Sequence, residues 1–281
     1  MSFDPGPTLP SSPHDDRPLI KELLADKAAQ LIELQQLICE HVHYKASLHD
    51  DVWLLRFLLS HERSGVKAAA AAVCYTLDWR HRHGMDAVSD ELRRLPTAME
   101  HPAVVRGHSV YCPPGAMEFI HPDPARGPVL LCTFARCDFH AAAAKLGRDE
   151  YAACMRATNE WFFLQCDRVS RETGRLTRSL RVVQLKGIAV RSLNRTWLNM
   201  DAAVARDLEN CYPQLVGLVV CLDPPSWALA MWRAVKVLFP ARLIEKILII
   251  PRSARAELER KLQRFVALED LPELYGGAGA G

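Results

Sequence analysis

Apolar residues between positions 19 and about 95 recur with the spacing of helices. Residues 66–84 contain five of them at i, i+3, i+4, i+7 and i+11, which are Val66, Ala69, Ala70, Val73 and Leu77. Such residues share one face of a helix. A similar pattern predicts a helix within residues 19–42, and Asp50 with Asp51 marks the start of another, because acidic side chains suit the unpaired amides of a helix N-terminus. Residues 19–95 are therefore predicted to form a small helical module.

After His101, short strand-like runs alternate with helix-like segments. We expect strands at residues 128–134, 179–185, 215–222 and 246–250, and helices at residues 149–171, 199–210, 226–239 and 254–267. Strands separated by helices need crossover connections, which favour a largely parallel or mixed sheet. The predicted fold is thus α/β, with an α/β domain at residues 96–277 following the helical module.

Both ends of the chain lack such patterns. Residues 1–18 carry five prolines without helical periodicity, so we expect a disordered tail. Residues 278–281 belong to a glycine-rich end that we expect to be flexible.

The expected helix at residues 226–239 has almost no polar face. Two neighbouring faces of this helix carry the apolar residues Trp227, Ala228, Met231, Trp232, Val235, Leu238 and Phe239. Only Arg233 and Lys236 are charged. One interpretation is a buried core helix whose two cations extend to water; another is a helix that contacts lipid.

The composition indicates a globular protein in a reducing compartment. The chain has 281 residues, 49% of them hydrophobic, and a formal net charge of +2, which argues neither for nor against a polyanionic partner, so any basic site must be local. We expect no nucleic-acid partner. Its nine cysteines form no CxxC pair, which is typical of reduced, buried thiols in the cytoplasm. The longest apolar run, residues 215–222, is far shorter than the roughly 18 residues that span a bilayer.

Motifs for common chemistries are missing. The chain has no GxSxG, GxxxxGK[ST] or GxGxxG sequence. The pairs His41 with His43 and His81 with His83 lie two apart on expected helices, where they point in different directions, so we expect no metal site. We therefore expect no catalytic residue and no cofactor. The alternative hypothesis, a hydrolase acting on a prenol or ester, has no support other than an expected pocket.

Four stretches between about residue 50 and residue 277 resemble, in order, the CRAL-TRIO lipid-binding family, which includes fungal phosphatidylinositol transfer proteins and retinaldehyde and tocopherol carriers. They are DDVWLLRFLLSHERSGVKAAAAAVCYTLDWRHRHG, SLRVVQLKGIAV, NCYPQLVGLVVCLDPPSWALAMWRAVKVLFPARLIEKILII and LPELYGG. The resemblance implies that a mixed sheet with helices encloses an apolar pocket and that a mobile gate helix closes it. The implied gate and membrane-contact residues are Trp227, Met231, Trp232, Arg233, Val235, Lys236, Leu238 and Phe239.

The resemblance also implies ligand-binding positions. Lys246 matches a lysine that helps to hold the inositol phosphate, whereas Gln214 and Leu243 replace a glutamate and a threonine. Ser179 matches a serine of phosphatidylcholine binders, while Arg181 and Leu130 replace their threonine and tyrosine. Near residues 59–65 the alignment slips by one residue, so His61 and Arg63 are both candidates for a basic group of the family.

These features predict a cytoplasmic monomer that binds one hydrophobic ligand and exchanges it during transient contact with a membrane. The expected ligand is a phospholipid of the phosphatidylinositol or phosphatidylcholine kind. A non-transferring adaptor or lipid sensor, and a carrier of a sterol, retinoid or tocopherol, are the alternatives.

Overall fold

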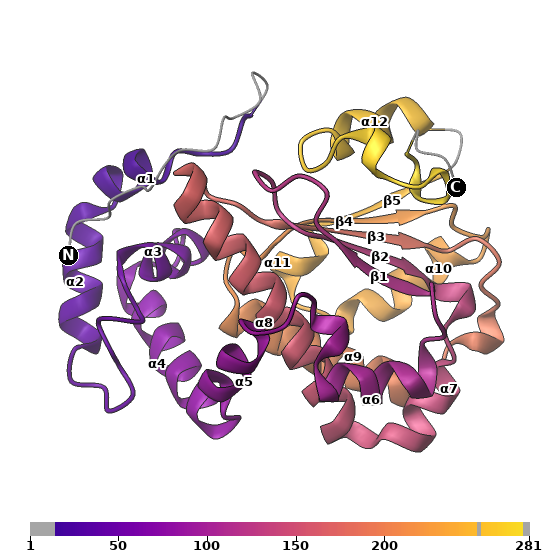
Figure 1. Ribbon diagram of the computed structural model, residues 1–281, viewed down its shortest axis with the longest axis horizontal. Helices are drawn as coiled ribbons and strands as arrows, with labels where there is room; N and C mark the ends of the chain where they lie inside the picture. Colours follow the sequence, from indigo (N-terminus) through magenta and orange to yellow (C-terminus); the bar gives the residue numbers. More distant parts are fainter. Residues whose placement is uncertain (1–14, 252–253, 278–281) are drawn as a thin grey trace.

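A computed structural model describes residues 15–251 and 254–277 of the chain. Its N-terminal part consists of α1 (Ile20–Asp26), α2 (Ala28–Ile38), α3 (Asp51–Ser60), α4 (Val66–Arg82) and α5 (Met85–Leu92). These helices gather on one side of the molecule (Figure 1). Asp50 caps α3 by accepting a hydrogen bond from the Trp53 amide at 3.1 Å, as the acidic start of this segment predicts.

The second part alternates helices and strands. It comprises α6 (Pro102–Tyr111), β1 (Met117–Ile120), β2 (Val129–Thr133), α7 (Phe139–Ala141), α8 (Gly147–Thr173), β3 (Ser179–Gln184), α9 (Arg195–Cys211), β4 (Val216–Leu222), α10 (Ala228–Val235), α11 (Ala241–Ile244), β5 (Ile247–Ile250) and α12 (Arg255–Leu262). The strands form one sheet in the order β1-β2-β3-β4-β5. Strand β1 is antiparallel to β2 and the other pairs are parallel, so the expected mixed, largely parallel sheet is confirmed.

Side chains alternate between the two faces of this sheet. Leu180 and Val182 of β3 pack with residues of α12, which covers one face (Figure 1). Arg181 lies between these two residues in the sequence, and Val183 follows Val182. Both therefore point to the opposite face, on the side of α8 and α9. This second face carries the pocket described below.

Several predicted boundaries differ from the observed ones. Strand β1 and helix α6 were not expected; β1 is a short edge strand of four residues with an incomplete burial pattern. The expected helix at residues 226–239 ends at Val235 and continues only as a 3-10 turn, Lys236–Leu238. Phe239 is extended because it precedes Pro240, and the proline ring disfavours helical geometry in the residue before it.

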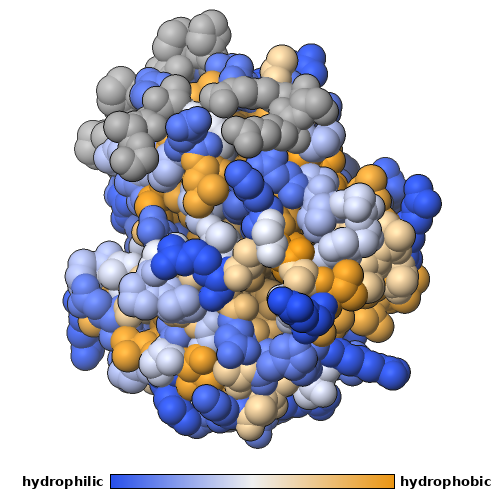
Figure 2. Space-filling view, turned by 90° about the vertical axis from the view of Figure 1, so that its right-hand side faces the viewer, coloured by the Kyte–Doolittle hydropathy of each residue, from blue (hydrophilic) through white to orange (hydrophobic). Residues whose placement is uncertain are grey.

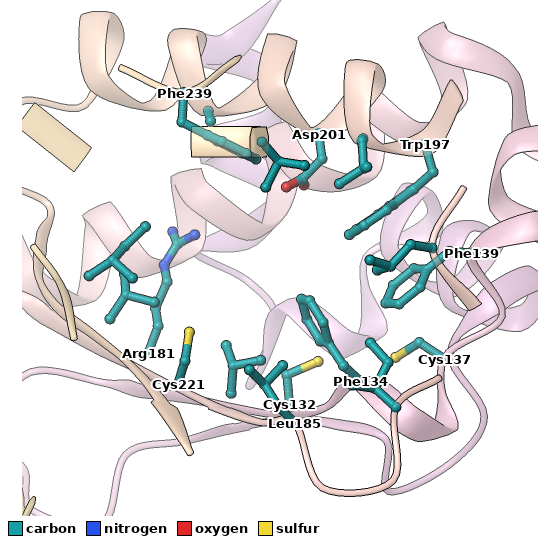
Figure 3. A pocket seen from close by; sticks show the side chains of 18 of the residues that line it. Cys132, Phe134, Cys137, Phe139, Arg181, Leu185, Trp197, Asp201, Cys221 and Phe239 are labelled. Atoms are coloured by element: carbon teal, nitrogen blue, oxygen red, sulfur yellow. The ribbon is translucent and has the colours of Figure 1, made fainter. Parts of the chain in front are cut away.

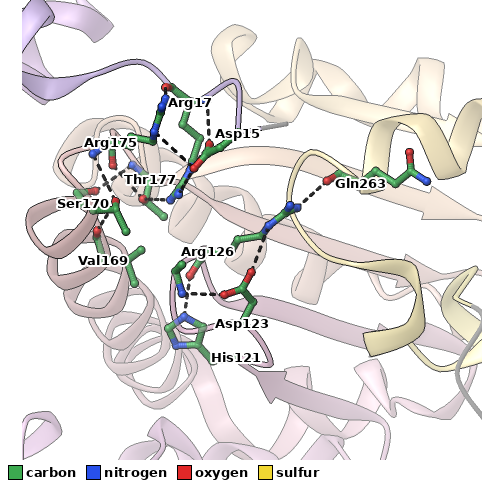
Figure 4. A network of polar contacts seen from close by, with 12 residues as sticks. Asp15, Arg17, His121, Asp123, Arg126, Val169, Ser170, Arg175, Thr177 and Gln263 are labelled. Carbon is green, nitrogen blue, oxygen red and sulfur yellow. Dashed lines mark hydrogen bonds and ion pairs between the residues drawn. The ribbon is translucent and has the colours of Figure 1, made fainter. Parts of the chain in front are cut away.

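Residues 15–18, which fall in the predicted disordered tail, are held against the body of the protein (Figure 4). Arg17 binds the Asp15 carboxylate at 2.6 Å and donates a hydrogen bond to Thr177 Oγ1, also at 2.6 Å. Arg175 donates to the backbone oxygen of Arg17 at 2.7 Å. These polar contacts hold residues 15–18 in place although the segment has no helical pattern of apolar residues. The rest of that tail and residues 278–281 lie outside the described residues.

A buried carboxylate joins the N-terminal helices to the second part. Glu160 of α8 is almost fully buried and accepts hydrogen bonds from two nitrogens of Arg80 on α4, at 3.0 and 3.1 Å. It also accepts from Ser89 on α5 and, at 2.8 Å, from Tyr212 Oη. A single hydrophobic cluster includes residues of both parts. The two parts therefore share a core.

Helix α8 is the longest helix of the described segments, with 27 residues, and it carries charged residues along its length. Within these segments no helix is both long and apolar enough to cross a bilayer.

Candidate ligand-binding pocket

A cavity of about 290 Å³ lies between the second face of the sheet and the helices α9 and α10. Its floor is formed by alternate residues of β2, β3, β4 and β5, among them Leu130, Cys132, Val183, Val219, Cys221 and Ile247. In Figure 3 such side chains surround an open central space. The volume is near the lower end of the roughly 300–1,000 Å³ that is usual for ligand pockets.

Helix α9 supplies the wall opposite the sheet. Besides Leu198, its lining residues recur at i, i+4, i+7, i+8 and i+11, which places them on one face of the helix: Trp197, Asp201, Val204, Ala205 and Leu208. Trp197 stacks on Phe139 with ring centroids 3.9 Å apart. Asp201 is the one charged residue in this set, and its carboxylate points into the cavity (Figure 3).

The remaining side of the cavity is closed by residues 226–239, called the gate segment from here on. Five of its eight predicted residues line the cavity, namely Trp227, Met231, Trp232, Val235 and Phe239. Arg233 and Lys236 are exposed instead, and Leu238 is half-buried outside the lining. The segment thus presents one side to the cavity and its two cations to water. Its movement as a gate stays a prediction.

The predicted ligand-binding residues are not brought together. Leu130 and Leu243 line the cavity, whereas Ser179, Gln214 and Lys246 lie outside its lining. Ser179 is fully buried and donates to the Leu215 backbone oxygen at 3.0 Å.

Gln214 donates a hydrogen bond to Ser60 Oγ at 3.1 Å, close to the two basic candidates of the sequence. His61 next to Ser60 has its pKa lowered by burial, which favours the neutral imidazole, and Arg63 is exposed. A head-group role for Gln214 or for either basic residue stays a prediction.

Lys246 has a protein partner. Its Nζ lies 2.9 Å from Oε1 of Glu209, whose side chain is 7% exposed. Glu209 belongs to α9 and Lys246 precedes β5, so the ion pair joins the wall of the cavity to the edge of its floor. The geometry supports a structural role for Lys246, and its predicted contact with an inositol phosphate is untested.

Replacing Lys246 by alanine should lower the free energy of unfolding by about 1–3 kcal/mol, because Glu209 would be left buried without its cation. Chemical denaturation measures this loss, and the double variant Lys246→Met with Glu209→Gln should recover most of it. If Lys246→Ala keeps full stability but loses binding of an anionic phospholipid only, Lys246 is a ligand residue and the structural assignment is wrong.

Two charged residues, Arg181 and Asp201, line the cavity. The sequence indicates Arg181 only as the replacement of a threonine and gives no indication of Asp201. Burial lowers the pKa of Arg181 to about 10, an effect partly offset by the negative charges of Asp201 and Glu209. Burial raises the pKa of Asp201, while hydrogen bonding from Tyr151 opposes the shift. A charged residue inside the apolar run SLRVVQL was the available sequence signal.

Thiols also contribute to the lining, through Cys132, Cys137 and Cys221. Burial raises the pKa of the Cys221 thiol to about 12, so it remains protonated at neutral pH. All nine cysteines are free. In residues 15–251 and 254–277, no group of three or more His, Cys, Asp or Glu side chains is arranged to hold a metal ion.

Comparisons with known proteins agree with this architecture. Residues 115–277, more than half of the chain, match the family model described as the CRAL/TRIO domain. A CRAL-TRIO domain-containing protein of Caenorhabditis elegans is 22% identical over 270 residues, which are 94% of this chain and 36% of that protein. Protein real-time of Aedes aegypti is 22% identical over 251 residues, covering 89% of this chain and 36% of that protein. The chain therefore spans about a third of the length of these relatives.

Among solved structures, the fold is similar to that of Sfh5. The TM-score is 0.57 at 12% sequence identity, and the match covers 92% of this chain and 86% of Sfh5. This likeness concerns the fold.

Proposed function

Because the chain belongs to the CRAL/TRIO domain family, whose domains bind hydrophobic ligands, we propose that it carries a single lipid in the cavity beneath α10 and exchanges it at membrane surfaces. The observation that carries this proposal is the position of the gate segment. Its apolar side chains line the cavity while its charged residues face water. Such a segment can release a ligand without unfolding the sheet or α9.

Contact with a membrane is supported by exposed groups of the same segment. Leu229 and Val237 are 51% and 77% exposed, and burial of their surface in lipid would contribute about 25 cal/mol per Å². Arg233 and Lys236 are exposed nearby in sequence and would attract lipid phosphates, at about 1 kcal/mol each. Figure 2 shows hydrophobic surface exposed among charged groups on one side of the molecule. We propose transient rather than permanent attachment.

The proposed ligand is a phospholipid of the phosphatidylinositol or phosphatidylcholine kind. A cavity of about 290 Å³ is small for a two-chain lipid, and we propose that α10 moves outward when such a ligand binds. A sterol, retinoid or tocopherol-like molecule needs less movement. We propose carriage without bond chemistry, by a monomer in the cytoplasm, where free thiols such as the nine of this chain persist.

Protein purified from its own cells should carry one lipid-like molecule per chain. The reason is that an apolar cavity of this kind gains free energy when apolar surface replaces water. Native mass spectrometry before and after solvent extraction checks the mass and the identity of the ligand.

Vesicle assays distinguish a lipid carrier from an adaptor or lipid sensor. Transfer of the identified lipid between donor and acceptor vesicles supports a carrier, and vesicle binding without transfer supports an adaptor or sensor. A chain that repeatedly yields no bound molecule and accepts none contradicts the proposal. Turnover of the loaded lipid would indicate an enzyme instead.

A further inference from the structure

We infer that the pocket selects lipids with an acidic oxyanion, a carboxylate or a phosphate, and that Arg181 binds this group inside the cavity. The inference rests on the proposed function, because it requires that a ligand enters this cavity. It names the chemical class of that ligand and the residue that recognises it.

The first step is the position of the guanidinium. Arg181 lies in the middle of β3, between residues that pack against α12, so its side chain projects from the opposite face of the sheet. The side chain is half-buried although it lies deep within the fold, because its accessible surface belongs to the cavity wall. In Figure 3 the guanidinium points into the open space below α9.

The second step is the incomplete set of partners. Arg181 donates one hydrogen bond, from Nη2 to Asn159 Oδ1 at 2.8 Å. Its Nη1 makes no hydrogen bond with the described residues, and its Nε is buried without a partner there. A guanidinium carries five N–H donors, and unpaired donors of a buried cation are costly. A ligand that accepts from Arg181 would remove part of this cost.

The third step concerns the nearby negative charges. Glu209 is already paired with Lys246 at 2.9 Å. Asp201 faces Arg181 across the cavity in Figure 3, and no ion pair joins these two side chains in the described parts of the chain. The cation of Arg181 is therefore influenced by carboxylates without direct contact. An oxyanion is the group that a guanidinium binds best, through two parallel hydrogen bonds.

Asp201 does not exclude an anion from this site. Its Oδ1 accepts a hydrogen bond from Tyr151 Oη at 2.8 Å, and Tyr151 in turn accepts from Trp197 Nε1 at 3.1 Å. Burial raises the pKa of Asp201, and the charge of a bound anion would raise this pKa further. Both effects favour the protonated carboxyl group, which can donate a hydrogen bond. Tyr111 also lines the cavity, and its hydroxyl is buried without a partner in the described structure.

The test uses delipidated full-length protein and two matched ligand pairs. Oleate is compared with oleyl alcohol, and lysophosphatidate with monooleoylglycerol, so that each pair shares one acyl or alkyl chain and differs in the acidic group. Loading is measured by native mass spectrometry in competition. Wild-type protein should prefer the acidic member of at least one pair by about tenfold or more, the effect expected of a hydrogen bond to a charged group. The pair that shows the preference distinguishes a carboxylate from a phosphate.

Variants connect the preference to one residue. Arg181→Met should abolish it by weakening the acidic ligand about tenfold while changing the neutral one less than about twofold. Arg178→Met is the matched control, since Arg178 is also half-buried, next to β3, with its Nε unpaired among the described residues, but it lies outside the cavity lining, and it should keep the preference. Asp201→Asn should keep or increase the preference, and it remains informative if Arg181→Met does not fold.

Three results would overturn the inference: equal loading of acidic and neutral ligands by the wild type, a preference for the alcohols, or a preference that survives Arg181→Met. A preference for alcohols that is lost in Asp201→Asn would mean that a hydroxyl bridges Arg181 and Asp201. If neither member of either pair loads, the proposed carriage of a lipid fails as well, so the two failures are distinguishable.

Discussion

Replacing Glu160 by alanine should lower the free energy of unfolding by about 3–5 kcal/mol, because one partner of a buried ion pair is removed and the other remains. Arg80 would keep its charge in a site where its side chain is 13% exposed. The hydroxyl of Tyr212 would lose its acceptor at the same time, whereas Ser89 could still donate to the Met85 backbone oxygen at 2.8 Å. Denaturation in urea, followed by both fluorescence and circular dichroism, measures the change.

Glu150→Ala is a matched control for this variant. Glu150 is on the same helix, but its ion pair with Arg106 is 3.5 Å long and both side chains are about half exposed. Its loss should therefore cost less than about 1 kcal/mol. The double variant Glu160→Ala with Arg80→Met should recover part of the stability, since no uncompensated charge remains. A loss below about 1 kcal/mol in Glu160→Ala would show that water reaches this network.

The combined variant Trp227→Ala with Trp232→Ala should slow lipid exchange between vesicles by about tenfold or more while lowering stability much less than removal of a core tryptophan does. Both indoles are half-buried and line the cavity, so they lie where contact with ligand and bilayer is proposed. Each aromatic ring buries about 150–250 Å², which corresponds to several kcal/mol when it passes from water to lipid.

Trp53→Ala provides the comparison. Trp53 is 6% exposed in α3 of the N-terminal part and does not line the cavity. Its removal should cost about 3–5 kcal/mol of stability and leave the exchange rate per folded molecule unchanged. If the Trp227 and Trp232 variant instead loses as much stability as Trp53→Ala and retains full exchange, α10 is an ordinary core helix.

The order of the secondary structure elements could be predicted because hydrophobic spacing carries it. Helix α4 and strands β2 to β5 were expected close to their observed places, since their apolar residues follow helical spacing or form short buried runs. Strand β1 could not be recognised because its four residues lie at a sheet edge and only some of them are buried. The end of α10 was expected too late, although Pro240 was a readable signal against helical geometry at Phe239.

Much of the apolar lining could also be predicted, whereas its polar part could not. The gate residues could be predicted because, in the order of the motifs, the segment that forms α10 follows directly after strand β4. The approach of Asp201 to Arg181 depends on how α9 packs over the sheet, and no local pattern specifies that packing. The same holds for Lys246 and Glu209, which are 37 residues apart in the chain and meet only in the folded protein.

The contact that holds residues 15–18 has a consequence for folding during synthesis. Arg17 and its partner Thr177 are 160 residues apart. At about 5–20 residues per second, the ribosome needs roughly 8–30 seconds to make the intervening chain. The cluster in which Ile20 is buried, with Val52, Leu55 and Leu176, is likewise complete only after Leu176 has been made. The start of helix α1 therefore reaches its contacts with the second part only after residue 177 is made, and nascent chains arrested before residue 175 should leave residues 15–20 open to proteases or chaperones.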